Sequence, residues 1–191
     1  MKLSQEFWAG LNFTYLLGIL ASMCFITSAA MWYQFYDHEL PCPLCLLQRL
    51  AYFGIGFGVI QIVRNKVSVR YIGYMMLFTL FLLIVAERQS LLDIVVRPNH
   101  GWIGSAVLGL HMPIWSVVVS LLLLISYAIN FSVLKYNDTF MAIKIEHYPR
   151  LKKIASALIL YIILLCIVNL IAIVLQCGLY NCHTDSYLLL N

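Results

Sequence analysis

The sequence PCPLCLLQR, residues 41–49, decides the fold expected for this chain, because it places a cysteine pair at the start of a long apolar run. That run continues to residue 63, and a helix that crosses the hydrocarbon core of a membrane needs about 20 mostly apolar residues. Arg49 follows Cys45 by one helical turn, so the two side chains share one face of a helix. The stretch therefore predicts a membrane helix that begins with two thiols, Cys42 and Cys45, and carries a cation one turn deeper.

Composition and four further apolar runs place the whole chain in a membrane. The 191 residues are 63% hydrophobic and 10% charged, with a mean hydropathy of +0.90, whereas soluble domains are about 45–50% apolar and about 25% charged. The sequence predicts an all-α integral membrane protein, a four-helix transmembrane bundle plus a fifth transmembrane helix. Residues 1–135 are expected to form the four-helix core, and residues 136–191 a connector, the fifth span and a tail. The expected spans are residues 13–32, 44–63, 69–86, 113–134 and 154–175.

The basic residues are distributed unevenly between the two sides that five spans create. Nine lie on the side of the N-terminus, and two, Arg88 and Arg97, lie on the other side. Because loops rich in Lys and Arg stay in the cytoplasm, we expect a cytoplasmic N-terminus and a C-terminus outside. A cleaved signal peptide is the alternative for the first run, although its apolar core is longer than the roughly 7–15 residues usual for such a segment. The nine basic residues are Lys2, Arg64, Lys66, Arg70, Lys135, Lys144, Arg150, Lys152 and Lys153.

Two segments carry expectations about packing. Gly54, Gly56 and Gly58 in the second run are typical of a helix face that packs closely against a neighbour, and glycines merely tolerated in a membrane helix are the alternative. The outer loop, residues 87–112, is apolar and contains no cysteine. We expect it to lie flat in the membrane interface with Trp102 at headgroup depth.

Cys42 and Cys45 have the position of a reactive dithiol. At a helix N-terminus the helix dipole and the N–H groups stabilise a thiolate, which is the nucleophilic form of cysteine. Pro43 suits the first helical turn, where its missing N–H costs nothing. Three alternatives remain for the pair: a structural disulfide, half of a metal site with His38, or unreactive thiols.

Arg49 is a charged residue inside an apolar run. Such a residue costs about 2.5–3.5 kcal/mol at the centre of a membrane helix and less near an end, so it is usually kept for a polar partner. One turn below Cys45, its guanidinium would bind a quinone carbonyl and favour an anionic thiolate. Snorkelling of the side chain to the interface is the alternative. Gln48 is a second, weaker polar candidate.

Cys177 and Cys182 follow the fifth run and enclose the turn-forming sequence GLYN. Five spans return the chain to the side of Cys42, an oxidising compartment in which disulfides persist. A short exposed disulfide there is reachable by the thiolate of a partner, and strained exposed disulfides are labile. A structural disulfide explains this pair equally well. Cys24 and Cys166 lie inside spans and are expected to behave as small inert apolar side chains.

The run Pro41-Cys42-Pro43-Leu44-Cys45-Leu46-Leu47-Gln48-Arg49 resembles the Cys-x-Leu-Cys-x-x-x-Arg signature of the disulfide bond formation protein B (DsbB) family. The segment GLHMPIW, residues 109–115, is similar to that family's entry to its fourth helix. The resemblance covers roughly residues 10–135. It implies that Cys42 and Cys45 form the quinone-coupled pair, with Cys45 facing the quinone and Cys42 exchanging with a second pair. It also implies that Arg49 helps to bind the quinone.

The chain departs from that family in the place of the second cysteine pair. Family members of the best-known type hold it in the outer loop between helices three and four, and here that loop has no cysteine. Our hypothesis is that Cys177 and Cys182 have taken over its role. The family also has polar residues near the quinone where Glu87 and Arg88 stand, but its usual His is absent there, so neither residue is assigned.

The predicted function is a bacterial inner-membrane thiol:quinone oxidoreductase that supports disulfide bond formation. The chain would reoxidise a periplasmic thioredoxin-like thiol oxidase, similar to DsbA, at Cys177 and Cys182. The electrons would pass through Cys42 and Cys45 to ubiquinone or menaquinone held near Arg49. Membrane lipid is the other expected partner, and no nucleic acid is expected.

Two alternative functions remain. The first is an enzyme that carries reducing equivalents outward or reduces a quinone epoxide, which would need an electron donor on the cytoplasmic side. The second is a soft-metal-binding membrane protein that uses the same outer-face cysteines, with His183 as a further ligand.

Overall fold

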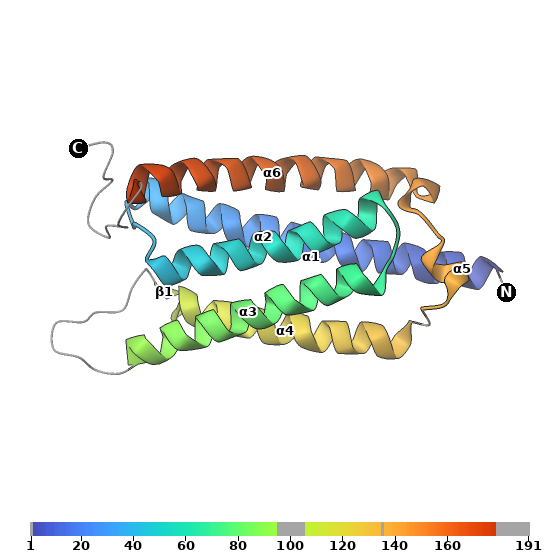
Figure 1. Ribbon diagram of the computed structural model, residues 1–191, viewed down its shortest axis with the longest axis horizontal. Coiled ribbons are helices and arrows are strands. Elements are labelled where there is room, and N and C mark those ends of the chain that lie inside the picture. Colours follow the sequence, from blue (N-terminus) through green and yellow to red (C-terminus); the bar gives the residue numbers. More distant parts are fainter. Residues whose placement is uncertain (1, 95–105, 135, 179–191) are drawn as a thin grey trace.

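Five long helices form an elongated bundle in the computed structural model, which describes residues 2–94, 106–134 and 136–178 (Figure 1). Each of the five is long and apolar enough to cross a membrane, which confirms the five predicted spans. The chain is therefore a multi-pass, all-α membrane protein. The helices are α1 (Lys2–Tyr36), α2 (Pro43–Arg64), α3 (Val69–Ile94), α4 (Met112–Val133) and α6 (Pro149–Cys177).

Helix α2 lies at the centre of the packing. It packs most extensively against α3, which also packs against α4, while α1 packs against both α2 and α6. Glycines allow the close approach of α3: a Cβ atom on Gly54 would lie 2.3 Å from the ring of Phe78, and one on Gly58 would lie 2.3 Å from Cγ of Met75. Gly56 points toward α6 instead. The expected close packing is confirmed, although the three glycines serve two neighbouring helices rather than one.

The outer segment between α3 and α4 differs from the expected flat loop. Helix α3 continues to Ile94, so residues 87–94 are helical and the prediction of an interfacial loop is wrong for them. The physical reason is that this extra stretch has an inward face, since Gln89, Ser90 and Asp93 are buried in the bundle. A short hairpin of β1 (Ala106–Val107) and β2 (Leu110–His111) then leads into α4. Trp102 lies outside the described residues.

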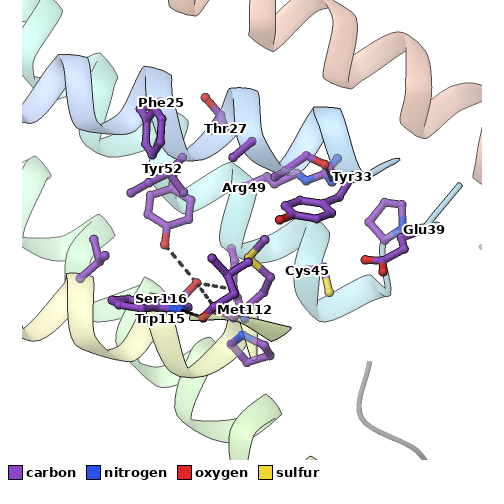
Figure 2. Close-up of a pocket in the computed structure, with 18 of the residues that line it drawn as sticks. Phe25, Thr27, Tyr33, Glu39, Cys45, Arg49, Tyr52, Met112, Trp115 and Ser116 are labelled. Carbon is purple, nitrogen blue, oxygen red and sulfur yellow. Dashed lines mark hydrogen bonds between the residues drawn. The ribbon is translucent and has the colours of Figure 1, made fainter. Parts of the chain in front are cut away.

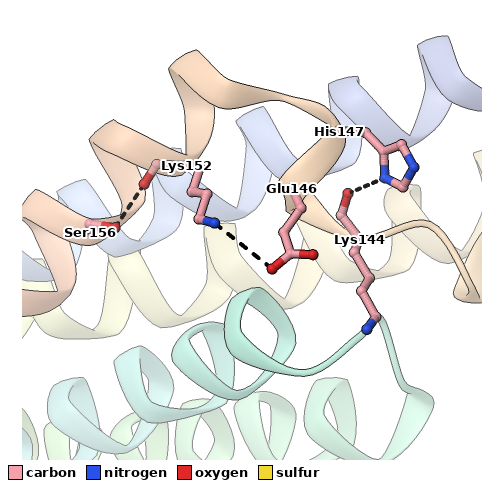
Figure 3. Close-up of polar contacts among 5 residues, drawn as sticks. All are labelled: Lys144, Glu146, His147, Lys152 and Ser156. Carbon is pink, nitrogen blue, oxygen red and sulfur yellow. Dashed lines mark hydrogen bonds and ion pairs between the residues drawn. The ribbon is translucent and has the colours of Figure 1, made fainter.

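The opposite end of the bundle carries the N-terminus and short connecting elements (Figure 1). Helix α5 (Asp138–Met141) and a 3-10 turn, η1 (Ile145–His147), join α4 to α6. Figure 3 shows Lys152, on the first turns of α6, in an ion pair with Glu146 at 3.8 Å. The nearby ring of His147 lies 3.1 Å from the carbonyl oxygen of Lys144 (Figure 3). These are local contacts between exposed residues.

Candidate redox site

The pair Cys42 and Cys45 lies at the N-terminus of α2, as the sequence predicts. Cys42 is the N-cap residue, with φ −69° and ψ 162°, and Pro43 occupies the first turn. The Cys45 backbone N–H donates to Sγ of Cys42 at 3.1 Å. Both thiols are free, and Cys42 is buried. A hydrogen bond with Cys45, together with burial, raises the pKa of the Cys42 thiol.

A chain of hydrogen bonds leads from the bundle interior to Cys45. The Tyr52 hydroxyl donates to Oγ of Ser116 at 3.0 Å, and the Ser116 hydroxyl donates to Oε1 of Gln48 at 2.7 Å. Nε2 of Gln48 donates to Oε1 of Gln89 at 2.8 Å, and Nε2 of Gln89 donates to Sγ of Cys45 at 3.3 Å. Each of these four hydrogen bonds is donated in the direction of the sulfur, and the Cys45 thiol itself lies 3.8 Å from Oε1 of Gln89. Because hydrogen bonds donated to an anion stabilise it, this arrangement favours negative charge on Sγ of Cys45.

Arg49 points into the bundle rather than toward the interface. Its side chain is 7% exposed, so the snorkelling alternative is wrong. Nη1 donates to Oε1 of Gln34 at 2.5 Å and to Oδ1 of Asn169 at 3.2 Å, and Nη2 donates to the carbonyl oxygen of Ala30 at 3.0 Å. The acceptors belong to α1 and α6, so three helices meet at this one guanidinium.

A cavity of about 530 Å³ opens beside the cysteine pair (Figure 2). Cys45, Gln48 and Arg49 line it from α2, while most of the remaining lining is apolar or aromatic and comes from α1, the β1–β2 hairpin and α4. Figure 2 shows the α2 side chains between those of α1 and α4. Such a site, mostly apolar with a few convergent polar groups, has the character of a small-molecule pocket.

The end of α6 lies at the same end of the bundle as Cys42. Nε2 of Gln176 donates to the carbonyl oxygen of Pro41 at 3.0 Å, directly before Cys42 in the chain. Cys177, the last residue of α6, is disulfide-bonded. The structure therefore brings Cys177 and the first pair to one end of the molecule. Cys182 lies outside the described residues.

Other predicted or considered residues lie away from this site. Glu87 and Arg88 are exposed, and the neighbouring Gln89 is the α3 residue that reaches Cys45. Cys24 is buried, as expected of an inert apolar thiol, whereas Cys166 is exposed on the outer surface of α6. Among the described residues, no three His, Cys, Asp or Glu side chains gather as metal ligands do.

Four functional candidates escaped the sequence analysis. All four are buried: Gln34 and Asn169 accept hydrogen bonds from Arg49, whereas Gln89 and Ser116 are hydrogen-bonded to Gln48. Their only sequence signal is that each is a polar residue in or beside an apolar run, which is unusual in a membrane helix. Which polar residues face each other depends on the rotation of every helix, and the hydropathy pattern does not determine that rotation.

Comparison with known proteins points to one family. The family model described as "Disulfide bond formation protein DsbB" matches residues 12–100. The disulfide bond formation protein B of Cupriavidus metallidurans is 26% identical over 146 residues, which are 61% of this chain and 91% of that protein. Those of Nitrosomonas eutropha and Nitrosomonas europaea are 42% and 38% identical over 65 and 77 residues. These shorter matches cover 32% and 38% of this chain and 40% and 47% of those proteins. No solved structure matches the chain.

Proposed function

We propose, from the premise that this chain belongs to the disulfide bond formation protein B family of membrane disulfide oxidoreductases, that it reoxidises a periplasmic dithiol protein and passes the electrons to a membrane quinone. The partner would be a thioredoxin-like thiol oxidase similar to DsbA. The electron acceptor would be ubiquinone or menaquinone. The single observation that carries the proposal is that Cys45 and Arg49 line the same apolar cavity at the end of α2.

The proposed route consists of two thiol–disulfide exchanges and one reduction. A thiolate of the reduced partner attacks the disulfide between Cys177 and Cys182, and the partner leaves oxidised. The two resulting thiols then reduce the disulfide between Cys42 and Cys45 by the same chemistry. Finally, the dithiol of Cys42 and Cys45 is reoxidised while two electrons and two protons convert the quinone to a quinol.

The surroundings of Cys45 support its role as the quinone-facing thiol. It lines the cavity, and Nε2 of Gln89 donates to its sulfur, so a negative charge on Sγ is stabilised where the acceptor would bind. Arg49 lines the same cavity as a buried cation and would bind a quinone carbonyl, since a guanidinium is a strong hydrogen-bond donor. The residue before Cys42, Pro41, accepts a hydrogen bond from Gln176 near the end of α6, so Cys42 would exchange with the second pair.

The proposal includes the orientation of the protein in the membrane and the role of each part of the chain. Basic residues concentrate at the end of the bundle opposite the cysteines, so we place the N-terminus in the cytoplasm and the C-terminus in the periplasm of a bacterial inner membrane. Residues 1–135 would form the four-helix redox core. Residues 136–191 would form the cytoplasmic connector, the fifth span and the periplasmic tail that carries the shuttle pair.

The test is turnover by the purified protein in detergent. A reduced thioredoxin-like thiol oxidase plus wild-type protein should reduce added short-chain ubiquinone or menaquinone stoichiometrically. The double variant Cys177→Ser/Cys182→Ser should lose oxidation of the partner while still binding quinone. Full activity of that double variant would refute the shuttle role of the C-terminal pair, and a clean wild-type preparation without quinone reduction would refute the proposed function as a whole.

A further inference from the structure

Helix α6 has one narrow buried face along its length. Apart from Cys177 at its end, its buried residues recur at intervals of three, four and seven, which is the spacing of a single helix face. Most of them are apolar, as expected for packing against α1 and α2. Two, Asn169 and Gln176, are polar amides placed seven residues apart on that same face. The buried residues of this face are Ala155, Ile162, Leu165, Asn169, Ala172 and Gln176.

Both amides bind parts of the redox site rather than each other. Oδ1 of Asn169 accepts a hydrogen bond from Nη1 of Arg49 at 3.2 Å. Two turns further along the helix, Nε2 of Gln176 donates to the carbonyl oxygen of Pro41 at 3.0 Å. One face of α6 thus contacts the cation of the cavity and the backbone that leads into Cys42.

The cost of these side chains explains why their contacts matter. Burying a polar group in an apolar environment costs free energy unless the group is hydrogen-bonded. A buried amide in a membrane helix such as α6 is therefore unfavourable without a hydrogen-bond partner. Leucine at either position would pack against α1 and α2 without that cost. Asn169 also shares a donor with α1, because Nη1 of Arg49 donates both to Oδ1 of Asn169 and to Oε1 of Gln34.

We infer that α6 is a positioning element of the redox site, in addition to carrying Cys177 to the outer end. Asn169 holds the Arg49 guanidinium at the cavity wall between α6 and α1, and Gln176 holds the segment that precedes Cys42 against the end of α6. Both are positioning residues, since they act through Arg49 and through the backbone of Pro41. The inference rests on the proposed function, because it assigns these residues to the binding of the quinone and to exchange between the two pairs.

The experiment separates quinone binding from thiol exchange. Asn169→Leu removes the acceptor and should raise the KM for quinone about tenfold, since a hydrogen bond to a charged group is lost, with little change in the rate at which reduced partner is oxidised by stoichiometric enzyme. Asn169→Asp keeps an oxygen acceptor toward Arg49 and should restore a KM close to that of the wild type. Ser156→Leu, on the exposed side of the same helix, should leave both quantities unchanged.

A direct binding measurement makes the test independent of turnover. Quinone Kd is measured in detergent by quenching of tryptophan fluorescence, since Trp115 lines the cavity, and it should rise in Asn169→Leu and recover in Asn169→Asp. Unchanged KM and Kd in Asn169→Leu, or equal damage by Leu and Asp, would overturn the inference while an active wild type leaves the proposed function standing. A wild-type protein that neither binds nor reduces quinone would overturn both.

Discussion

The two ends of the helix bundle differ in whether they bury charged side chains. At the cysteine end, polar side chains are buried and bind across helices: Arg49 is 7% exposed and reaches acceptors on α1 and α6. At the other end the charged side chains are exposed, and Lys152 and Glu146, which are 55% and 65% exposed and lie six residues apart in the chain, form a local ion pair. In a protein with 10% charged residues, the buried charge of Arg49 thus marks the end of the bundle where chemistry is expected.

Physical reasoning ranks the two kinds of contact. A buried donor or acceptor that loses its partner costs about 1–3 kcal/mol, and more when a charge is involved. An exposed ion pair contributes about 0–1 kcal/mol and is screened by salt. Substitutions of the buried polar residues at the cysteine end should therefore change function strongly, and substitution of the exposed ion pair at the opposite end should change almost nothing.

The largest effect is expected at the sulfur that ends the hydrogen-bond chain. Cys45→Ser should abolish quinol formation, because a serine hydroxyl does not ionise near neutral pH and cannot form a disulfide with Cys42. The measurement is quinone reduction by reduced partner in detergent. Cys166→Ser, on the outer surface of α6, is the matched control and should keep full activity. Equal activity of the two variants would remove Cys45 from the proposed route.

The next largest effect is expected at Gln89. Gln89→Leu removes the amide that donates to Sγ of Cys45, and a hydrogen bond to a charged group contributes about 1.5–3 kcal/mol. Alkylation of Cys45 by iodoacetamide in the reduced protein at pH 7 should slow by about tenfold or more, as followed by peptide mass. Gln61→Leu, the same change at the other end of α2 where Gln61 accepts from Asn65, should leave that rate unchanged. A normal alkylation rate in Gln89→Leu would mean that the chain of donors does not act on the sulfur.

A smaller decrease in the reactivity of Cys45 is expected at Ser116, which lies two residues beyond Gln89 in the series of hydrogen bonds. Ser116→Ala removes the hydroxyl that accepts from Tyr52 and donates to Gln48, at a cost of about 1 kcal/mol. Cys45 should then be alkylated about fivefold more slowly. Exposed Ser132, which bonds only within its own helix turn in the described structure, supplies the control Ser132→Ala. An effect of Ser116→Ala larger than that of Gln89→Leu would contradict the order of the chain.

The smallest effect is expected at the exposed end. Glu146→Gln removes the ion pair with Lys152 and should lower the free energy of unfolding by no more than about 1 kcal/mol. Thermal unfolding in detergent at low and high salt measures this, because the difference between variant and wild type should vanish at high salt. Quinone reduction should not change. A loss of activity here would show that the two ends are coupled and would break the contrast between them.

The sequence predicts the five spans and the position of the cysteine pair well, but it predicts poorly which polar residues are buried. Five spans follow from apolar runs of about 20 residues, and the place of Cys42 and Cys45 follows from where the second run begins. The sequence predicts that the third span ends at residue 86, before Glu87 and Arg88, whereas α3 continues to Ile94. The polar residues Gln89 and Asp93 in this extension are buried, so here polarity marks the interior of the bundle.

The partners of Arg49 illustrate why the rest could not be predicted. The sequence shows that Arg49 lies one turn below Cys45, and it also indicates that an arginine in a membrane span needs polar partners. Gln34 and Asn169 lie 15 and 120 residues away in the chain. Their convergence requires that α1 and α6 pack against each other and against α2, which no local pattern specifies.

The contact between Asn169 and Arg49 has a consequence for engineering. If α6 only carried the second cysteine pair, it could be deleted. The remaining four-helix protein would then work once a cysteine pair was introduced into its outer loop. Here a truncation after residue 134 would delete a hydrogen-bond acceptor of the buried cation as well as the anchor of the segment before Cys42. Transplanting an outer-loop cysteine pair into the truncated chain would thus restore the missing thiols without restoring the site they serve.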